Sequence, residues 1–390
     1  MKTFFSVITA VAISLFVSLT LSEMFVRAFA PPWLEQRMSI LAPATANFSG
    51  FGTDRNWKVE RKNGKFVSFT PHSQFNVSHV EYLNVANIDR FGGRRTFPSY
   101  GALPRVIVLG DSFTFGVGVE DHETVVSQMA IKVPGATFLN LGVPGSALPQ
   151  QLEIVKERHA ELASNLYVFF FFLGNDFADI LQYDLASSKG GSAKETNSPQ
   201  SNPNDGVLWK VNDFIYHHPL LRHSYLIQLL RKFSLDALSV AYPGAVPPSD
   251  PILIMMDGSK VEYHDKAMTA IIRQLRALLD AQDRLGFRSL LIAIPDRQQL
   301  SPSIREFQAQ IHSVPLALLD PFRPNQLLRT AAASVGIPFF DPTQCISAAG
   351  YKIEELYYHQ DSHFRALGYE TLANCVVEYV ARSFALSGQR

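Results

Sequence analysis

The chain has 390 residues, of which 47% are hydrophobic and 18% are charged, and its 35 basic residues balance its 35 acidic residues. This composition excludes a disordered polypeptide, which combines low hydrophobicity with high net charge. A formal net charge of zero also argues against a nucleic-acid partner bound by bulk electrostatic attraction. Two cysteines, Cys345 and Cys375, are too few for a framework of disulfides or for a zinc site built on thiolates.

Residues 1–30 are predicted to form an uncleaved signal anchor, a single transmembrane helix. The stretch from Thr3 to Ser22 carries no charge and is rich in Phe, Val, Leu and Ile, and about 20 apolar residues span the core of a bilayer. A cleaved signal peptide is an alternative, because Ala28-Phe29-Ala30 resembles a cleavage site; a buried helix is a third. The anchor predicts that most of the chain lies outside the cytoplasm, in the periplasm or beyond.

Residues 31–100 are expected to form a linker and a small N-terminal extension, because Pro, Asn and Gly interrupt every periodic run. The pattern changes in residues 101–386. Short apolar runs alternate there with stretches compatible with helices, and such strands indicate a parallel sheet covered by helices on both faces. The predicted strands are Val106–Leu109, Thr137–Leu141, Leu166–Leu173, Ser289–Ile294 and Ile337–Phe340.

An insertion at about residues 183–264 interrupts this alternation. It opens with Ser187–Gly206, which is dense in Ser, Gly, Asn and Pro and is typical of a loop. It also contains the aromatic stretch Trp209–Tyr216. We expect the insertion to form a lid or a subdomain on the substrate side.

Function in open parallel sheets collects at the carboxyl ends of the strands, and Gly110-Asp111-Ser112-Phe113 follows the first of them. Two other serine and glycine motifs do not fit. The hydrolase elbow G-x-S-x-G requires Gly where this chain has Thr114, and a P-loop requires a lysine that is absent near Gly116. Taken alone, Ser112 fits a helix N-cap as well as a nucleophile.

Three further blocks at predicted strand ends and loops favour the nucleophile. They are Asn140-Leu141-Gly142-Val143-Pro144-Gly145, Leu173-Gly174-Asn175-Asp176 and Asp361-Ser362-His363. Together with Leu109-Gly110-Asp111-Ser112-Phe113, these blocks resemble, in the same order, the four blocks of the SGNH or GDSL-type esterase family. The similarity spans Gly110 to His363 and is greatest to membrane-anchored bacterial members.

The resemblance implies a three-layer α/β/α sandwich with a central parallel, flavodoxin-like sheet. It also implies a Ser-His-Asp triad of Ser112, His363 and Asp361. Serine is a poor nucleophile and needs a base within hydrogen-bond reach, which His363 would supply, while Asp361 would orient the imidazole and stabilise its charged form. The other ten histidines are expected to be surface or core residues.

The orienting carboxylate departs from the usual family pattern, which places two residues between Asp and His. Only Ser362 lies between Asp361 and His363. Glu354, Glu355 and Asp341 therefore stay open as alternatives to Asp361.

Acyl transfer through serine develops negative charge on the carbonyl oxygen, and hydrogen-bond donors must stabilise it. The resemblance implies an oxyanion hole made of the Ser112 N–H, the Gly145 N–H and the Asn175 side-chain amide. Gly142 is a rival for the Gly145 role but is more typical of a turn. Asp111 and Asp176 are expected to brace their loops through hydrogen bonds.

These observations predict a membrane-anchored serine esterase that hydrolyses acyl esters, with short acyl chains favoured. Its substrate would be a small acyl ester or an acylated carbohydrate. One alternative is an O-acetyltransferase or deacetylase acting on a cell-surface polysaccharide, and another is a catalytically silent binding module of the envelope. Neither a metal nor an organic cofactor is indicated, the membrane is the one predicted partner besides the substrate, and no nucleic acid is expected.

Overall fold

The computed structural model describes residues 2–31, 34, 52–53, 59–62, 65–79, 81–98, 105–133, 135–188, 218, 221, 223–230, 233, 250–359 and 361–387. The chain divides into two compact units. The smaller unit consists of residues 1–49 and 202–248, and the larger unit consists of residues 50–201 and 249–390.

The smaller unit contains helix α1 (Lys2–Ala28). The Glu23 carboxylate on this helix accepts hydrogen bonds from the backbone N–H groups of Tyr225 (3.0 Å) and Leu226 (2.9 Å), and Leu34 is fully buried within the unit. Over the part of the chain that the structure describes, no helix is both long enough and apolar enough to cross a membrane. The transmembrane helix expected in residues 1–30 is therefore not supported by the structure.

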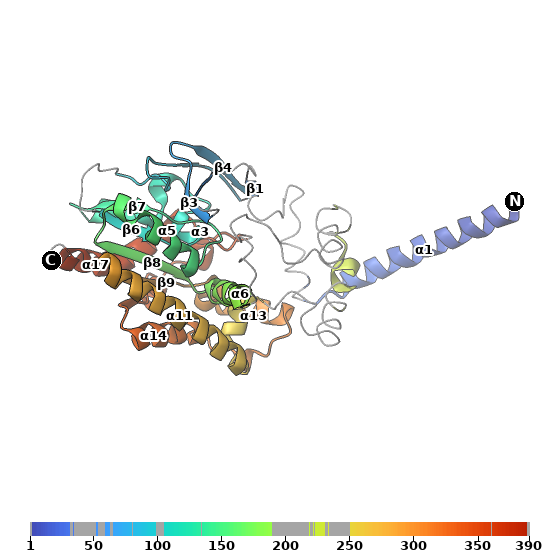
Figure 1. Ribbon diagram of the computed structural model, residues 1–390. Coiled ribbons are helices and arrows are strands. Elements are labelled where there is room, and N and C mark those ends of the chain that lie inside the picture. Colours follow the sequence, from blue (N-terminus) through green and yellow to red (C-terminus); the bar gives the residue numbers. More distant parts are fainter. Residues whose placement is uncertain are drawn as a thin grey trace. The chain divides into compact units, whose positions relative to one another are not determined.

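The larger unit is built on a five-stranded sheet with the order β10-β9-β8-β6-β7, in which every pair of neighbours is parallel (Figure 1). All five strands expected from the apolar runs are present. Their bounds are β6 (Arg105–Leu109), β7 (Thr137–Asn140), β8 (Leu166–Phe172), β9 (Arg288–Ile294) and β10 (Phe339–Phe340).

The sheet is apolar on both faces, and this explains why its strands show continuous rather than alternating hydrophobicity. All seven residues of β8 are buried. Tyr167, Phe169 and Phe171 pack with the helices of one face, whereas Phe170 and Phe172 pack with those of the other. The aromatic run is therefore a core strand, as expected.

Helices cover both faces of the sheet, which gives the predicted α/β/α layers (Figure 1). One face packs against α5 (Leu148–Leu162), α6 (Asp176–Ser188), α10 (Pro251–Met256), α11 (Val261–Leu285) and α14 (Arg323–Val335). The other face packs against α4 (Val125–Lys132), α15 (Thr343–Ala348), α16 (Ile353–Leu356) and α17 (Ala366–Ser387). Shorter helices in the connections are α3 (Ser112–Phe115), η1 (Asp121–Glu123), α12 (Arg297–Leu300), α13 (Pro302–Ile311) and η2 (Leu316–Leu318).

The N-terminal extension adds two small antiparallel sheets to the larger unit. One has the order β1-β4-β5 and the other pairs β2 with β3. Phe69, Phe75 and Val77 from these strands belong to the same hydrophobic core as the central sheet. The described part of the extension is thus packed onto the sheet. The bounds are β1 (Gly52–Thr53), β2 (Val59–Lys62), β3 (Lys65–Phe69), β4 (Gln74–His79) and β5 (Tyr82–Asn87).

The predicted insertion at residues 183–264 is described at its two ends and, between them, at residues 218, 221, 223–230 and 233, which belong to the smaller unit. Residues 183–188 belong to α6, and residues 250–264 include α10 and the start of α11. Most of Ser187–Gly206 and all of Trp209–Tyr216 lie outside the described residues. The expectation of a lid therefore stays a prediction.

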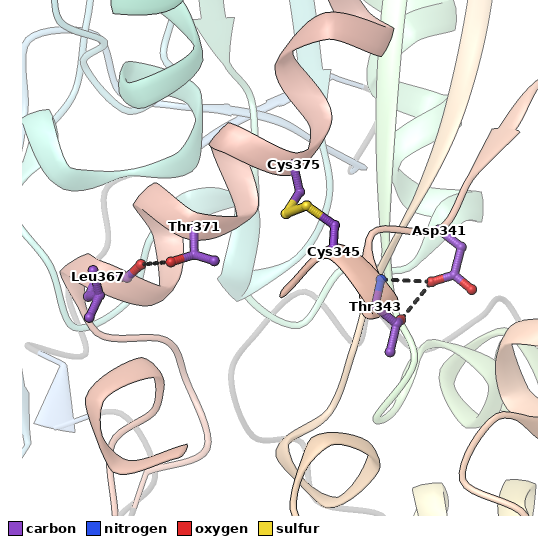
Figure 2. The surroundings of a disulfide bond; sticks show 6 residues. All are labelled: Asp341, Thr343, Cys345, Leu367, Thr371 and Cys375. Carbon is purple, nitrogen blue, oxygen red and sulfur yellow. Dashed lines mark hydrogen bonds between the residues drawn. A yellow bond between two sulfur atoms is a disulfide. The ribbon is translucent and has the colours of Figure 1, made fainter. Parts of the chain in front are cut away.

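Cys345 and Cys375, which the sequence analysis left unpaired, form a disulfide (Figure 2). The bond joins α15 to α17 and closes a sequence separation of 30 residues. Beside it, Asp341 accepts hydrogen bonds from the N–H and the hydroxyl of Thr343, at the start of α15 (Figure 2). The disulfide therefore fixes α17, the helix that directly follows the His363 loop.

Candidate active site

Ser112 is the first residue of α3, a single helical turn that follows strand β6, which lies between β8 and the edge strand β7. The Asp111 carboxylate caps this turn by accepting a 2.9 Å hydrogen bond from the Phe113 N–H. Gly110 is required just before it, because a Cβ atom there would lie 2.0 Å from the Thr114 hydroxyl oxygen. Ser112 is only 7% exposed. Its hydroxyl is therefore held by a folded helical turn and not by an open loop.

Arg94, which the sequence analysis did not single out, braces the other end of this turn. It is fully buried and donates hydrogen bonds to the carbonyl oxygens of Phe115 (3.1 Å), Gly116 and Val119 (2.5 Å). The last carbonyls of a helix have no partner within the helix, and Arg94 supplies one. Its charge is balanced by Asp121, at 3.0 Å.

His363 lies between Ser112 and Asp361 in one chain of hydrogen bonds. Its Nε2 atom is 2.7 Å from the Ser112 Oγ atom, and its Nδ1 atom bonds to Asp361 Oδ1. The same Asp361 oxygen accepts a 2.9 Å hydrogen bond from the His363 backbone N–H. A carboxylate that accepts from the backbone two residues later forms a tight local turn. This turn explains how one intervening residue suffices to place the carboxylate against the ring.

The three alternative carboxylates are engaged elsewhere or exposed. Asp341 accepts hydrogen bonds from Thr343 at the start of α15. Glu355 accepts a 2.7 Å hydrogen bond from the Lys352 N–H and so caps α16, while Glu354 is exposed. Of the four candidates, Asp361 is the one whose carboxylate contacts the His363 ring.

The electrostatics of the pair favour a charged carboxylate beside a basic imidazole. Burial opposes the imidazolium form of His363, but the adjacent Asp361 charge and hydrogen bond outweigh it and raise the pKa of His363. Burial likewise raises the pKa of Asp361, but the His363 charge and several hydrogen bonds more than offset this effect and lower that pKa. Asp361 is therefore ionised at neutral pH.

Two backbone donors stand free at the strand ends near the serine. Among the described residues, none accepts a hydrogen bond from the N–H of Ser112 or of Gly145. Gly145 has a positive φ of 74°, and a Cβ atom built on it would meet nothing within 4 Å. Backbone conformation, rather than a close neighbour in the protein, thus requires glycine there. The Gly142 N–H is already bound to Asn140 Oδ1 at 3.0 Å, which argues against its rival role.

Asn175 follows β8 and donates a 2.8 Å hydrogen bond from its side-chain amide to Asp179. A second hydrogen of the same amide is left for another acceptor. Burial and the Asp111 charge raise the pKa of Asp179 to about 7, and burial raises the pKa of Asp111 to about 6. Asp176 accepts a 3.0 Å hydrogen bond from the Phe172 N–H. Asp111 and Asp176 thus brace their loops, as expected.

Within the described ranges, no group of three or more His, Cys, Asp and Glu side chains could hold a metal ion. The chemistry that the arrangement offers is nucleophilic. It combines a hydroxyl, a base within hydrogen-bond distance of it, a carboxylate on the far side of that base, and nearby N–H donors.

The comparisons with known proteins returned structural similarities alone. No protein-family model and no curated protein matched the chain. Among solved structures, it is similar to a lipolytic protein of the G-D-S-L family from Veillonella parvula, with 13% identity, a TM-score of 0.38, and coverage of 71% of this chain and 98% of the other.

A lipase/acylhydrolase from Enterococcus faecalis is similar at 12% identity and a TM-score of 0.37, covering 72% of this chain and 97% of its own. An acetylxylan esterase from Geobacillus stearothermophilus is similar at 12% identity and a TM-score of 0.34, covering 72% and 96%. At these values the similarities carry no argument about the site, whose function must be argued from its own geometry.

Proposed function

We propose that this protein is a serine ester hydrolase of SGNH type, which cleaves carboxylic esters through Ser112, His363 and Asp361. The observation that carries this proposal is the hydrogen-bonded chain from the Ser112 hydroxyl through both ring nitrogens of His363 to the Asp361 carboxylate. An orienting group, a base and a nucleophile in this order form the arrangement that activates a serine.

The first half of the reaction forms an acyl-enzyme. With Nδ1 protonated toward Asp361, His363 Nε2 carries the lone pair that accepts the Ser112 proton. The serine oxygen attacks the ester carbonyl, and His363 then gives this proton to the departing alcohol. Asp361 stays ionised throughout and stabilises the imidazolium that forms between the two steps.

The second half releases the acid. His363 removes a proton from water, the resulting hydroxide attacks the Ser112 ester, and the proton returns to the serine oxygen. In both halves the carbonyl oxygen becomes negative. We assign its stabilisation to the Ser112 N–H, the Gly145 N–H and the Asn175 amide, since the two backbone donors are free and the Asn175 amide has a second hydrogen available.

The proposed location is outside the cytoplasm. The Cys345–Cys375 disulfide supports it, because disulfides persist in oxidising compartments and are rare in the cytosol. Labelling of intact cells with a thiol-alkylating reagent before any reduction tests this location. Alkylation of both cysteines before reduction would show that they were free thiols in the cell and would contradict it.

Hydrolysis is tested with the purified full-length protein and p-nitrophenyl esters of graded acyl length, with Ser112→Ala as the control. We expect product release that is lost in the variant and that falls as the chain grows from acetyl to octanoyl. The same reactions with an added sugar acceptor separate hydrolysis from transfer, since a transferase would form an acylated sugar at the expense of free acid. If neither product forms from any ester, the proposal is wrong.

A further inference from the structure

The hairpin formed by β4 and β5 contacts the carboxylate of the candidate triad. Tyr82, the first residue of β5, donates a 2.5 Å hydrogen bond from its hydroxyl to Asp361 Oδ2. The other carboxylate oxygen, Oδ1, already accepts from the ring and the backbone of His363. Each oxygen of the carboxylate thus has its own donors, and Tyr82 supplies one that is 279 positions away in the chain.

Glu81 holds the backbone of the same segment. Its two carboxylate oxygens accept 2.8 Å hydrogen bonds, one from the His359 N–H and the other from the Asp361 N–H. The turn of the hairpin is therefore hydrogen-bonded to the loop before α17, at His359 and at Asp361. These two hydrogen bonds hold the backbone of Asp361 beside the hairpin, where its carboxylate meets the Tyr82 hydroxyl.

An aromatic contact extends the hairpin toward the loop after Ser112. The Tyr82 and Tyr358 rings pack with centroids 4.8 Å apart, and the Tyr358 hydroxyl donates a 2.6 Å hydrogen bond to the Gly118 carbonyl oxygen. A Cβ atom at Gly118 would lie 2.7 Å from the Tyr358 ring. Tyr358 thus packs against Tyr82, but its hydroxyl bonds to the backbone and not to the triad.

We propose that Tyr82 is a positioning residue of the triad, whose hydroxyl shares the negative charge of Asp361 and thereby limits how basic His363 becomes. This inference rests on the proposed function, in which His363 must be neutral to accept the Ser112 proton. It assigns a role in the reaction to the N-terminal extension, which lies outside the four sequence blocks.

The direction of the effect follows from the charges. A hydrogen bond to an ionised carboxylate favours its charged form, so Tyr82 lowers the affinity of Asp361 for a shared proton. Burial, followed by the charge of Asp361, raises the pKa of Tyr82 far above its ordinary value, so the phenol stays protonated and remains a donor. Without this donor, the carboxylate attracts the imidazolium proton more strongly, and His363 becomes more basic.

The other ionisable groups that face this pair are not altered by the Tyr82→Phe substitution. Asp111 and Arg297 act on His363. The groups that act on or bond to the Asp361 segment are Glu81, Tyr358 and Tyr369.

The test compares Tyr82→Phe with the matched control Tyr358→Phe. Each variant removes one hydroxyl from the same pair of packed rings, but only the first hydroxyl bonds to the triad. We expect Tyr82→Phe to lower kcat about tenfold with little change in KM and to shift the acidic midpoint of kcat/KM upward by about 0.5–1 pH unit. Tyr358→Phe should leave the midpoint unchanged, whatever it does to thermal stability.

A second readout does not depend on activity. The pKa of the His363 ring is measured by NMR titration of protein with labelled histidine, and the resonance is assigned by its loss in His363→Gln. It should rise in Tyr82→Phe and not in Tyr358→Phe. If neither the kinetic midpoint nor the ring pKa moves upward in Tyr82→Phe, the inference is wrong. A wild-type protein that hydrolyses no ester, yet shows this rise, would instead refute the proposed function and support the role of Tyr82.

Discussion

Ser112 and His363 are separated by 251 positions in the chain, yet Ser112 Oγ lies 2.7 Å from His363 Nε2. Ser112 begins the turn after strand β6 of the sheet, and His363 lies in the loop that leads into α17. Helix α17 packs against one face of that sheet. The contact is therefore a property of the whole fold, and it places a base where a serine nucleophile needs one.

Ser112→Ala should abolish ester hydrolysis. Loss of a triad serine removes the covalent step, and precedent gives a decrease in kcat of several orders of magnitude. The melting temperature should change little, because the hydroxyl occupies the end of a capped turn and contributes little to the core. Steady-state kinetics with a short-chain p-nitrophenyl ester and a thermal scan test both expectations. Retention of more than about a tenth of the wild-type rate would refute the nucleophile.

The rate should depend on pH through His363. Only the neutral imidazole can accept the serine proton, and Asp361 raises the pKa of His363. Activity should therefore fall as the pH drops through that raised pKa, with a midpoint above the ordinary histidine value of about 6.5. A profile of kcat/KM between pH 5 and 9 measures the midpoint. A flat profile over this range would exclude histidine as the general base.

Asp361→Asn should lower kcat strongly while preserving the shape of the side chain. The amide no longer stabilises the imidazolium and can select the wrong ring tautomer; in the serine protease that serves as the general example, such a change costs about 10⁴-fold. Asp341→Asn, Glu354→Gln and Glu355→Gln are matched controls that remove a carboxylate charge away from the ring, and their kcat should stay close to that of the wild type. If Asp361→Asn kept the wild-type kcat and one of the controls lost it, the residue changed in that control would be the orienting carboxylate.

Asn175→Ala should lower kcat by about 10²–10³-fold with little effect on KM, the usual cost of removing one oxyanion-hole donor. Asp176→Asn is the control. Asp176 braces the same loop by accepting a hydrogen bond from the Phe172 N–H, and it is not one of the proposed oxyanion-hole donors. The control should lose thermal stability and retain most of its kcat. Equal losses of kcat in both variants would show that Asn175 acts through loop structure alone.

Removing the disulfide should destabilise the fold and leave the chemistry intact. The Cys345→Ser, Cys375→Ser double variant opens a loop with a sequence separation of 30 residues, which corresponds to about 3–4 kcal/mol in the chain-entropy model. Denaturant unfolding of the oxidised wild type and the double variant measures the difference. At temperatures where both are folded, kcat should agree within about twofold, since the disulfide joins α15 to α17 and the hydrogen bonds described for Ser112 and His363 go to other residues. An unchanged midpoint of unfolding would contradict this prediction.

The sequence alone determined the architecture of the sheet and one edge of the site. Continuous apolar runs of four to eight residues predict strands buried on both faces, and five such runs became the five parallel strands. Because function collects where the carboxyl ends of parallel strands meet, Ser112 could be singled out without coordinates, whereas Gly145 and Asn175 were expected beside it from the resemblance of their sequence blocks to a known family. Local hydrophobicity and strand direction are sufficient for the sheet and for the place of Ser112.

Tertiary structure decided which carboxylate contacts His363 and which residues outside the motifs support it. Spacing left Asp361 open against three rivals, and the tight turn at Asp361 resolved the choice of contact. Arg94 and Tyr82 lie in the segment that was expected to form a linker and a small N-terminal extension, and their partners are 21–27 and 279 positions away. The Cys345–Cys375 pairing was equally hidden. Hydrogen bonds and disulfides between distant residues leave no periodic trace in a sequence, because they depend on how separate elements pack and not on the local properties of either segment.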